Sequence, residues 1–440
     1  MSKRNDRREF LKTSAVIGAG YFVAAGLEAK ASTAAIETIR FGCIGVGGSK
    51  GGSDTEDAGR HGKVVAVCDV DDNFLNAAVK KYDGAKGFND FREMLDKMGD
   101  EIDAVTISTP DHMHAPAASK AMNMGKHCFC QKPLTRTIYE ARRLGQIAKD
   151  KKLVTQMGNQ GTAEDKLREA AAVLQSGVLG KISEVHIWTN RPIWPQGGPR
   201  PAPSDPPKHL HWDLWLGVAP QRPFGPGYHP FAWRGWWDFG TGALGDMACH
   251  TVNMPYMGLA LKDPTTVVAE TSGHNRDSFP KWSIITFEFP ANDKREGLKC
   301  MWYDGGKKPS KELLDGENPA PSGVVIVGEK GKVYAPGDYA ENGIKMFGGI
   351  EKPKVEWTKS PGHFTEFAEG IKGGPEPVSN ITNYSGPLTE VILLGNLAVW
   401  AAPDAGTGKK IEWDAKNLVA TNAPEVMSLV KPTYPAGYEL

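Results

Sequence analysis

The sequence carries no excess of charge of either sign. Its 440 residues include 52 basic and 52 acidic side chains, so the formal net charge is zero. Nucleic-acid-binding proteins usually show a clustered positive charge, because contacts to phosphates supply most of their affinity. No such excess is present here, and we expect no nucleic-acid partner.

Cysteines are few, and their spacing fits neither a zinc knuckle nor a redox pair. Four of the six, Cys43, Cys68, Cys128 and Cys130, fall in apolar runs typical of buried strands, and Cys249 falls in an expected helix. An oxidising compartment would permit disulfides, but nothing in the spacing requires one. We therefore expect buried free thiols.

Long apolar runs are missing as well. Beyond the first thirty residues, no stretch has the ~20 apolar residues that span a bilayer, so no membrane anchor is expected in the mature protein. The N-terminus reads D-R-R-E-F-L-K at 6–12, then a mildly apolar run at 13–27 and A-K-A at 29–31. This pattern predicts a twin-arginine signal peptide over 1–31 and a periplasmic protein. The alternative is a chance Arg-Arg pair ahead of a first helix.

A strand that runs into a glycine-rich turn follows this segment. The strand is the apolar run 39–44, and the glycines are Gly45, Gly47, Gly48 and, one position later than usual, Gly51. Glycines allow positive φ and let the backbone approach a pyrophosphate, whose charge is held by the N–H groups that open the next helix. Alone, the motif could also be a glycine-rich surface turn.

The residues after this turn favour a dinucleotide site. A second apolar run, 64–68, ends at Asp69. A carboxylate at that strand tip can accept hydrogen bonds from both ribose hydroxyls and repels a 2′-phosphate. Strand, turn, helix, strand and acid in this order predict a NAD site, with NADP disfavoured.

Further strands alternate with helices up to residue 160, and both of their faces are apolar, as in a covered parallel sheet. Three segments each follow a strand: Thr109-Pro110, Gln131-Lys132-Pro133 and 156–160. Because such sheets bind ligands at the carboxyl ends of their strands, all three should line one crevice. We predict an α/β fold that begins with a Rossmann domain over 36–160.

The pattern changes after residue 160. Strands are expected at 182–188, 265–271, 281–289, 297–303 and 323–334, and helices at 164–175, 363–371 and 388–400. This order predicts a C-terminal α+β domain over 161–440 with a large open, mainly antiparallel sheet. The open face of that sheet would be buried against a second copy, so a homo-oligomer is expected.

An arm rich in proline and tryptophan, residues 191–240, interrupts this domain. Eleven prolines lie between Arg191 and Phe231, which excludes a long helix or a central strand. Seven of the twelve tryptophans lie between positions 188 and 237, and aromatic planes beside charges are typical of carbohydrate sites. The candidate substrate residues are Trp233, Arg234, Trp237 and Asp238. Equally, the tryptophans could clamp the arm onto a neighbouring subunit.

Asp246 and His250 lie four residues apart in an expected helix and should project from one face. An imidazole, with an unperturbed pKa of about 6.5, suits proton transfer, and a carboxylate one turn away can orient it. The pair could also bind a metal together with His209, His211 and Asp213. No third ligand of matching geometry is evident, and we expect no metal.

These motifs together resemble the Gfo/Idh/MocA oxidoreductases over nearly the whole mature chain. The resemblance rests on the glycine turn, C-D-V-D at 68–71, S-T-P-D-H-M-H at 108–114, Q-K-P at 131–133, G-N-Q at 158–160 and G-D-M-A-C-H at 245–250. Members of the family are typically two-domain enzymes that pass hydride between NAD or NADP and a secondary alcohol of a sugar, cyclitol or related polyol.

The resemblance implies site residues. The catalytic set would be Lys132, Asp246 and His250, and the cofactor set Gly45, Gly47, Gly48, Asp69, Thr109, Pro110, His114, Gln131, Asn159 and Gln160. Where the family usually has Glu-Lys-Pro, this chain has Gln131. The neutral amide should favour the unprotonated form of Lys132 and help it act as a base, or the proton transfer has moved to His250.

Export bears on the expected reaction. A periplasm has no free nicotinamide pool, so a bound cofactor would be recycled in the same site. We expect an exported NAD-dependent oxidoreductase acting on a sugar, glycoside or cyclitol. One alternative is a redox-assisted NAD-dependent glycosidase, which oxidises, eliminates and re-reduces without the usual carboxylate pair. Another is a non-catalytic sugar-binding protein that keeps the fold.

Overall fold

The computed structural model describes residues 37–440. The predicted signal peptide, residues 1–31, lies outside the described residues. In residues 37–440, no helix is both long and apolar enough to cross a membrane. All six cysteines lie in the described part of the chain, and each is buried and free.

Six parallel strands form the N-terminal sheet, in the order β3-β2-β1-β4-β5-β6. They are β1 (Ile39–Ile44), β2 (Gly62–Cys68), β3 (Lys86–Phe88), β4 (Ala104–Ile107), β5 (His127–Cys130) and β6 (Thr155–Met157). The connecting helices are α2 (Gly48–His61), α3 (Asp72–Lys81), α4 (Phe91–Met98), α5 (Asp111–Asn123) and α6 (Ile138–Lys151). The predicted Rossmann fold is confirmed, and the strand order reverses between β1 and β4.

Local sequence explains where these elements begin. Every residue of β4 is buried, as expected for a central parallel strand. Helix α6 starts at a capping box, in which the Thr137 side chain accepts from the Glu140 N–H and the Glu140 side chain reaches back to the Thr137 N–H. Helix α3 is capped by Asp71, whose side chain accepts from the Asn73 N–H.

The C-terminal sheet has the order β13-β12-β11-β7-β10-β9-β8-β15-β16, and β14 pairs with β8. Its strands are β7 (Ile182–Trp188), β8 (Thr266–Ser272), β9 (Ser283–Phe289), β10 (Leu298–Tyr303), β11 (Gly323–Gly328), β12 (Gly331–Pro336), β13 (Lys345–Phe347), β14 (Ala405–Thr407), β15 (Ile411–Asp414) and β16 (Val419–Ala420). Only β7 and β10 pair in parallel in this described sheet. The mainly antiparallel sheet is therefore confirmed.

One predicted strand was wrong. Residues 323–334 form a hairpin of β11 and β12 rather than a single strand. A two-residue turn, Glu329-Lys330, separates the strands, and Gly328 pairs with Gly331 across it. The apolar pattern continues through the turn, so periodicity alone did not reveal the reversal.

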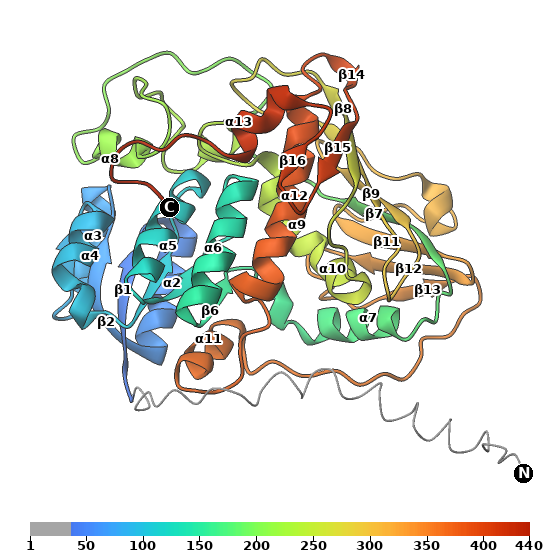
Figure 1. Cartoon of the computed structure of the whole chain (residues 1–440), viewed down its shortest axis with the longest axis horizontal. Coiled ribbons are helices and arrows are strands. Elements are labelled where there is room, and N and C mark those ends of the chain that lie inside the picture. Colours follow the sequence, from blue (N-terminus) through green and yellow to red (C-terminus); the bar gives the residue numbers. More distant parts are fainter. Residues whose placement is uncertain (1–36) are drawn as a thin grey trace, which may run out of the picture. The chain divides into compact units, whose positions relative to one another are not determined.

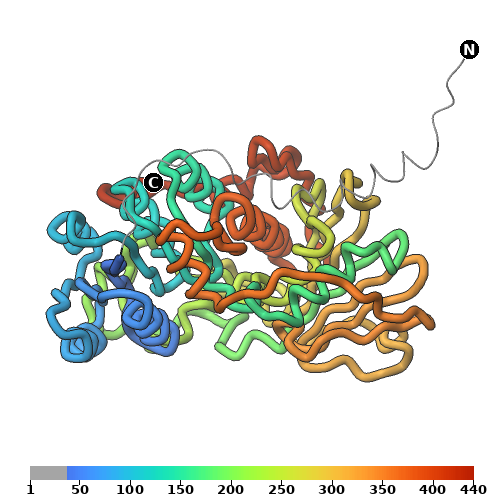
Figure 2. Tube along the Cα trace, turned by 90° about the horizontal axis from the view of Figure 1, so that it is seen from below, coloured from blue at the N-terminus to red at the C-terminus, as the bar shows by residue number. Residues whose placement is uncertain are grey.

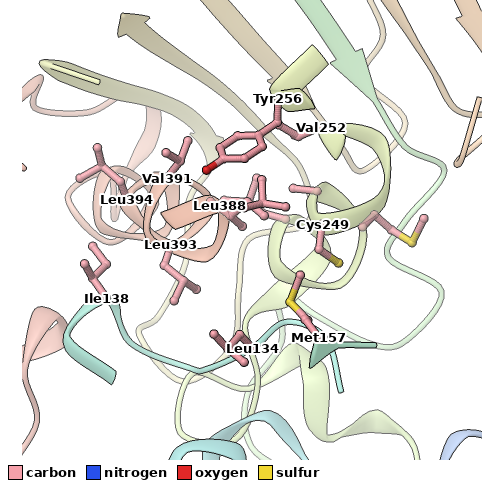
Figure 3. Close-up of a cluster of buried hydrophobic side chains, with 14 of the residues drawn as sticks. Leu134, Ile138, Met157, Cys249, Val252, Tyr256, Leu388, Val391, Leu393 and Leu394 are labelled. Atoms are coloured by element: carbon pink, nitrogen blue, oxygen red, sulfur yellow. The ribbon is translucent and has the colours of Figure 1, made fainter. Parts of the chain in front are cut away.

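Helices bury one face of this sheet and tie it to the Rossmann half (Figure 1). They include α7 (Asp165–Gln175), α9 (Gly242–Thr251), α10 (Asn253–Leu259) and α12 (Gly386–Trp400). Figure 3 shows Leu134 and Ile138 from the Rossmann half beside Leu388 and Leu393 of α12. Both sheets therefore share one continuous apolar core, which holds the residues of the two halves in fixed register.

The chain returns twice to the Rossmann half, once between β13 and β14 and once after β16. Helix α11 (His363–Ile371) packs Phe364 against Phe41 and Phe129. The last residues run from the short helix α13 (Met427–Val430) back to the Rossmann helices, where the C-terminus lies (Figure 1 and Figure 2). Tyr438 there packs against α4.

The arm is mostly irregular, as its prolines predict, with the short helix α8 (Trp212–Leu216) and one 3-10 turn at Ala232–Gly235. Its tryptophans hold it to the same chain. Trp212, Trp215 and Phe239 belong to one buried cluster, and the His112 ring on α5 hydrogen-bonds the backbone carbonyls of Trp215 and Phe239. Trp215 thus packs the arm against His112 of the Rossmann domain in the same chain.

Candidate active site

A cavity of about 460 Å³ lies at the carboxyl ends of the parallel strands, beneath the arm. Its volume is in the usual range for a small-molecule site. Eleven residues proposed from the sequence line it: Gly45, Gly47, Gly48, Asp69, Thr109, Pro110, Gln131, Lys132, Trp233, Arg234 and Asp246. The glycine turn and Lys132 thus line two different parts of one cavity.

The glycine turn has the geometry that a dinucleotide site requires. Gly45 has φ +76°, which favours glycine. A Cβ at Gly47 would overlap the Phe74 ring, and one at Gly51 would overlap the Gly45 carbonyl oxygen. Gly51 therefore permits close packing of α2 on the turn despite arriving one position late. A Cβ added at Gly48 would have no other atom within 4 Å, so the turn leaves open space on the cavity side.

Asp69 lies directly after β2, as predicted, and is 8% exposed. Its Oδ2 accepts from the N–H groups of Val46 and Gly47, at 3.0 and 2.9 Å. Burial raises the pKa of the Asp69 carboxyl, although these backbone hydrogen bonds oppose the shift. The carboxylate thus sits at the edge of the glycine turn, where the residues present fit the ribose of NAD.

Lys132 and Asp246 form a buried ion pair in the part of the cavity wall that the glycine turn does not line. The Lys132 Nζ lies 2.7 Å from Asp246 Oδ1 and donates to the Asp246 carbonyl oxygen at 3.0 Å. Burial alone would raise the pKa of Asp246, but the charges of Lys132 and Arg234 outweigh it and hold that pKa well below its usual range. Asp246 is therefore an anion that fixes the lysine amine at the cavity wall.

Two arginines complete this charge cluster. The Arg234 Nε lies 3.2 Å from Asp246 Oδ1, and its Nη1 donates to Asp111 Oδ1 at 2.8 Å. The Arg191 Nε lies 3.5 Å from Asp246 Oδ2. Arg191 also lines the cavity but was missed by sequence reasoning, because nothing near it in sequence marks it as a site residue.

His250 lies one turn after Asp246 on α9 but does not line the cavity. The residue is 2% exposed. Its ring packs edge-on against Tyr339 at 4.8 Å between ring centroids and has no hydrogen-bond partner at Nδ1 within the described part of the chain. Burial and the nearby Lys132 charge lower the pKa of His250 well below its usual value. The expectation that Asp246 orients His250 was wrong, since Asp246 binds Lys132 instead.

His114, expected to hold cofactor, is a structural residue. It is 1% exposed and does not line the cavity. Its Nδ1 lies 2.8 Å from the Pro133 carbonyl oxygen and its Nε2 2.8 Å from that of Thr109. The ring therefore ties together the two loops that do line the cavity.

The third strand-end segment, 156–160, does not reach the cavity either. Asn159 is fully buried and accepts from the Ser379 hydroxyl, while the Met157 N–H donates to the Ser379 carbonyl. Gln160 lies in the same covered stretch. The returning C-terminal segment covers the end of β6, so the cofactor assignments of Asn159 and Gln160 are not supported.

Two proposed substrate residues also point elsewhere. Trp237 is 7% exposed and stacks on Phe279 at 3.7 Å between ring centroids. Asp238 pairs with Arg222 and lies 3.9 Å from Arg200. Neither lines the cavity, because each side chain is taken up by a contact away from it, Trp237 with Phe279 and Asp238 with Arg222.

No group of three or more His, Cys, Asp or Glu side chains that could hold a metal occurs in residues 37–440. The histidines considered as metal ligands make other contacts. His211 Nε2 lies 3.0 Å from Asp72 Oδ1, and His209 Nε2 lies 3.6 Å from Asp71 Oδ2. They join the arm to the start of α3.

Comparison with known proteins places the chain in a family. A profile described as the oxidoreductase family with NAD-binding Rossmann fold matches residues 39–159, and one for the C-terminal alpha/beta domain of the same family matches 164–439. Levoglucosan dehydrogenase of Pseudarthrobacter phenanthrenivorans is 27% identical over 188 residues, which are 43% of this chain and 40% of that protein. Glycosyl hydrolase family 109 protein 1 of Shewanella sp. strain ANA-3 is 32% identical over 209 residues, 40% of this chain and 44% of that protein.

This chain thus spans about two fifths of the length of these curated relatives. Among solved structures, the WlbA dehydrogenase from Chromobacterium violaceum, in complex with NADH and UDP-GlcNAcA, superimposes with a TM-score of 0.62 over 88% of this chain and 99% of that one. Its sequence identity is 18%, so the likeness concerns the fold. By both domain matches, the chain belongs to the Gfo/Idh/MocA oxidoreductase family, whose members share the NAD-binding Rossmann fold described above.

Proposed function

We propose that this protein is an exported NAD-dependent oxidoreductase that transfers hydride to or from a secondary alcohol of a sugar, glycoside or cyclitol. The observation that carries the proposal is the Lys132–Asp246 pair, at 2.7 Å, in the same cavity as the glycine turn and Asp69. Nucleotide-binding features and a proton-transfer group thus share one site.

The residues divide the work. Bound NAD would supply the hydride acceptor or donor, with Gly45, Gly47 and Asp69 holding its adenosine diphosphate half. Of the cations around Asp246, Lys132 is the one that can exchange a proton, because a guanidinium is not deprotonated in proteins. We therefore assign to the Lys132 Nζ the transfer of the hydroxyl proton, with Asp246 holding the amine in place.

The wall around this pair suits a carbohydrate. Trp194 and Trp233 contribute aromatic planes, and Arg234 and Arg191 contribute hydrogen-bond donors. The relatives named levoglucosan dehydrogenase and inositol 2-dehydrogenase support a sugar or cyclitol as substrate. We keep Trp233 and Arg234 as proposed substrate contacts.

A redox-assisted glycosidase is the second candidate, favoured by the match to a glycosyl hydrolase family 109 protein. Ordinary glycosidases place two carboxyl groups about 5 to 9.5 Å apart around the scissile bond. Of the carboxylates that line this cavity in the described part of the chain, only Asp246 lies beside Lys132. Cleavage here would therefore proceed by oxidation, elimination and re-reduction.

A non-catalytic sugar-binding protein is the least favoured alternative. Such a protein would have no need of a buried lysine–aspartate pair beside its ligand, since burying two charges costs free energy.

Retention of bound, recycled NAD and export by the twin-arginine route stay proposals that rest on the N-terminal sequence. Replacing the Arg7-Arg8 pair by Lys-Lys should leave the precursor uncleaved and absent from the periplasmic fraction.

The function is tested with purified mature protein. Absorbance at 340 nm reports NADH formation from NAD with levoglucosan, myo-inositol and common aldoses, and p-nitrophenyl glycosides report hydrolysis with no net NADH. Lys132→Met should lower turnover by about two to four orders of magnitude while NADH still binds. The exposed Lys149→Met variant serves as the control. Full activity of Lys132→Met, or no NAD binding by the wild type, would contradict the proposal.

A further inference from the structure

A buried carboxyl that the proposed mechanism does not use lies directly behind the cavity wall. Asp54, on α2, is 5% exposed. Its Oδ2 accepts from the Ser108 hydroxyl at 2.7 Å and from the Gln131 Nε2 at 2.9 Å. Both donors line the cavity, so Asp54 is one residue removed from it.

Asp54 decides how Gln131 is oriented. Because the amide nitrogen of Gln131 donates to Asp54, its oxygen faces the backbone N–H of Lys132, at 3.2 Å. A Cβ at Gly158 would lie 2.5 Å from the Gln131 Nε2, so only glycine leaves room for this arrangement. A continuous path of hydrogen bonds therefore joins Asp54 to the residue that carries the amine.

The Asp54 carboxylate has no ionic partner among the ion pairs of residues 37–440. Burial raises its pKa to about 6, and the hydrogen bonds from Ser108 and Gln131 oppose that shift. Lys50 and Asp57 on the same helix act on it with opposite sign. Burial raises the pKa of the Cys43 and Cys130 thiols on the neighbouring strands β1 and β5, and the charge of Asp54 adds to that shift.

We infer that Asp54 is a positioning residue that supplies, from α2, the negative charge that the family's usual Glu-Lys-Pro pattern carries at position 131. It orients Gln131 against the Lys132 backbone. As a buried anion behind the cavity wall, it favours NAD⁺, whose nicotinamide ring is positively charged, over NADH, whose ring is neutral. The inference rests on the proposed function in that it requires NAD to bind in this cavity.

The test is the ratio of the dissociation constants of NADH and NAD⁺, measured by calorimetry at pH 5 and pH 8. The ratio cancels contributions from the adenosine half, which the two forms share. In the wild type it should fall about three- to tenfold from pH 8 to pH 5, as Asp54 gains a proton. In Asp54→Asn it should be low at both pH values.

Two further variants sharpen the test. The double variant Asp54→Asn/Gln131→Glu returns the charge to position 131 and should restore the high ratio at pH 8. Asp304→Asn is the matched control. Asp304 is a 4% exposed carboxyl in the C-terminal sheet whose pKa burial likewise raises to about 6, and its removal should leave the ratio unchanged.

Each outcome decides the inference. A wild-type ratio that does not change with pH overturns it without any variant, which covers the case of an Asp54→Asn protein that does not fold. A folded Asp54→Asn protein with the wild-type ratio at pH 8 overturns it as well. If the wild type binds neither form of NAD, the proposed function fails and the inference fails with it.

Discussion

Some buried carboxylates of this protein lie beside an opposite charge, and others lie only beside neutral hydrogen-bond donors. Lys132–Asp246 and Arg234–Asp111 are buried pairs at the cavity. Asp304, by contrast, receives only neutral donors: the Ser283 N–H and hydroxyl, both at 2.7 Å, and the Trp302 Nε1 at 2.9 Å. A buried carboxylate without an opposite charge is costly even when it is hydrogen-bonded, so Asp304 should make stability depend on pH.

Asp304 yields a prediction at this scale. Burial raises the pKa of the Asp304 carboxyl to about 6, above the value of about 3.9 in the unfolded chain. Between these values the folded state binds more protons than the unfolded state, so this contribution to stability is present below about pH 4 and is lost as pH rises through about 6. The loss should amount to about 3 kcal/mol.

Urea unfolding of the wild type and of Asp304→Asn at pH 4 and pH 7.5 tests this directly. The difference in unfolding free energy, wild type minus variant, should fall by about 2 to 2.5 kcal/mol on going to the higher pH, because at pH 4 about half of the unfolded-state carboxyl is already ionised. The exposed Asp404→Asn variant should follow the wild type. Parallel pH dependences of the wild type and Asp304→Asn would show that the carboxyl is not protonated in the folded state.

At the scale of elements, the arm is the part that closes the cavity. His229 Nε2 lies 3.0 Å from Asp71 Oδ2, and both are largely buried. His229, Pro230 and Phe231 of the arm all line the cavity. The contact between the arm and the start of α3 thus holds a wall of the site in place, and it is made by side chains rather than by a regular element.

Asp71→Asn should loosen the arm without removing the helix cap, because asparagine also caps helices well. Loss of the carboxylate that hydrogen-bonds His229 should accelerate NADH release about three- to tenfold, corresponding to about 1 kcal/mol for an interaction of this kind. Stopped-flow fluorescence measures the release rate. The exposed arm variant Asp205→Asn is the control, and equal rates in all three proteins would contradict a role for this contact.

The C-terminal segment forms another wall. Tyr434 donates its hydroxyl to Glu140 Oε1 on α6 at 2.9 Å, which anchors the segment. Tyr438 lies below the Arg92 guanidinium at 4.3 Å and lines the cavity beside Asn89 and Phe91. This stretch is on the Asp69 side, which fits the adenosine half of NAD. Sequence reasoning missed Tyr438, since it is far from α4 along the chain.

Tyr438→Ala should weaken NAD binding about three- to tenfold, because an aromatic contact contributes about 0.5 to 1.5 kcal/mol beyond area burial. Tyr438→Phe keeps the ring and should bind as the wild type does. Calorimetric titration distinguishes the two. If the alanine variant binds NAD with unchanged affinity, the tyrosine packs on α4 without touching the cofactor.

For the whole molecule, the C-terminal sheet has one face under helices and one that is only partly covered. On the inner face, Ile285 and Phe287 of β9 are buried under α12. On the other face, Val268, Ile284 and Met301 are half-buried. Partly exposed apolar side chains on the face of a broad sheet are typical of an interface with another protein surface.

We therefore expect self-association through this face. Replacing Met301 by Glu places a charge at its centre and should shift the protein to a smaller species in light scattering coupled to size-exclusion chromatography, because an unpaired charge in an apolar interface is costly. The exposed Lys149→Glu variant should keep the wild-type mass. A wild-type protein that elutes as a monomer at all concentrations would refute the homo-oligomer.

Motifs local in sequence proved the most predictable parts of the site. The glycine turn, Asp69 and the strand-end Lys132 were placed correctly on the cavity, because each follows directly from a strand whose apolar pattern is unambiguous. Errors came where distant segments meet. Asn159 is covered by the segment around Ser379, and Trp237 turns toward Phe279.

The sequence by itself determined the alternation of strands and helices in the Rossmann half and the family, since these depend on periodicity and on glycines whose conformation no other residue adopts easily. Only the tertiary structure decided that Asp246 binds Lys132 rather than His250, that Asp54 stands behind Gln131, and that the arm and Tyr438 close the cavity. Those contacts join residues that are far apart along the chain. They follow from how helices and loops pack around one shared core, and no local pattern encodes that packing.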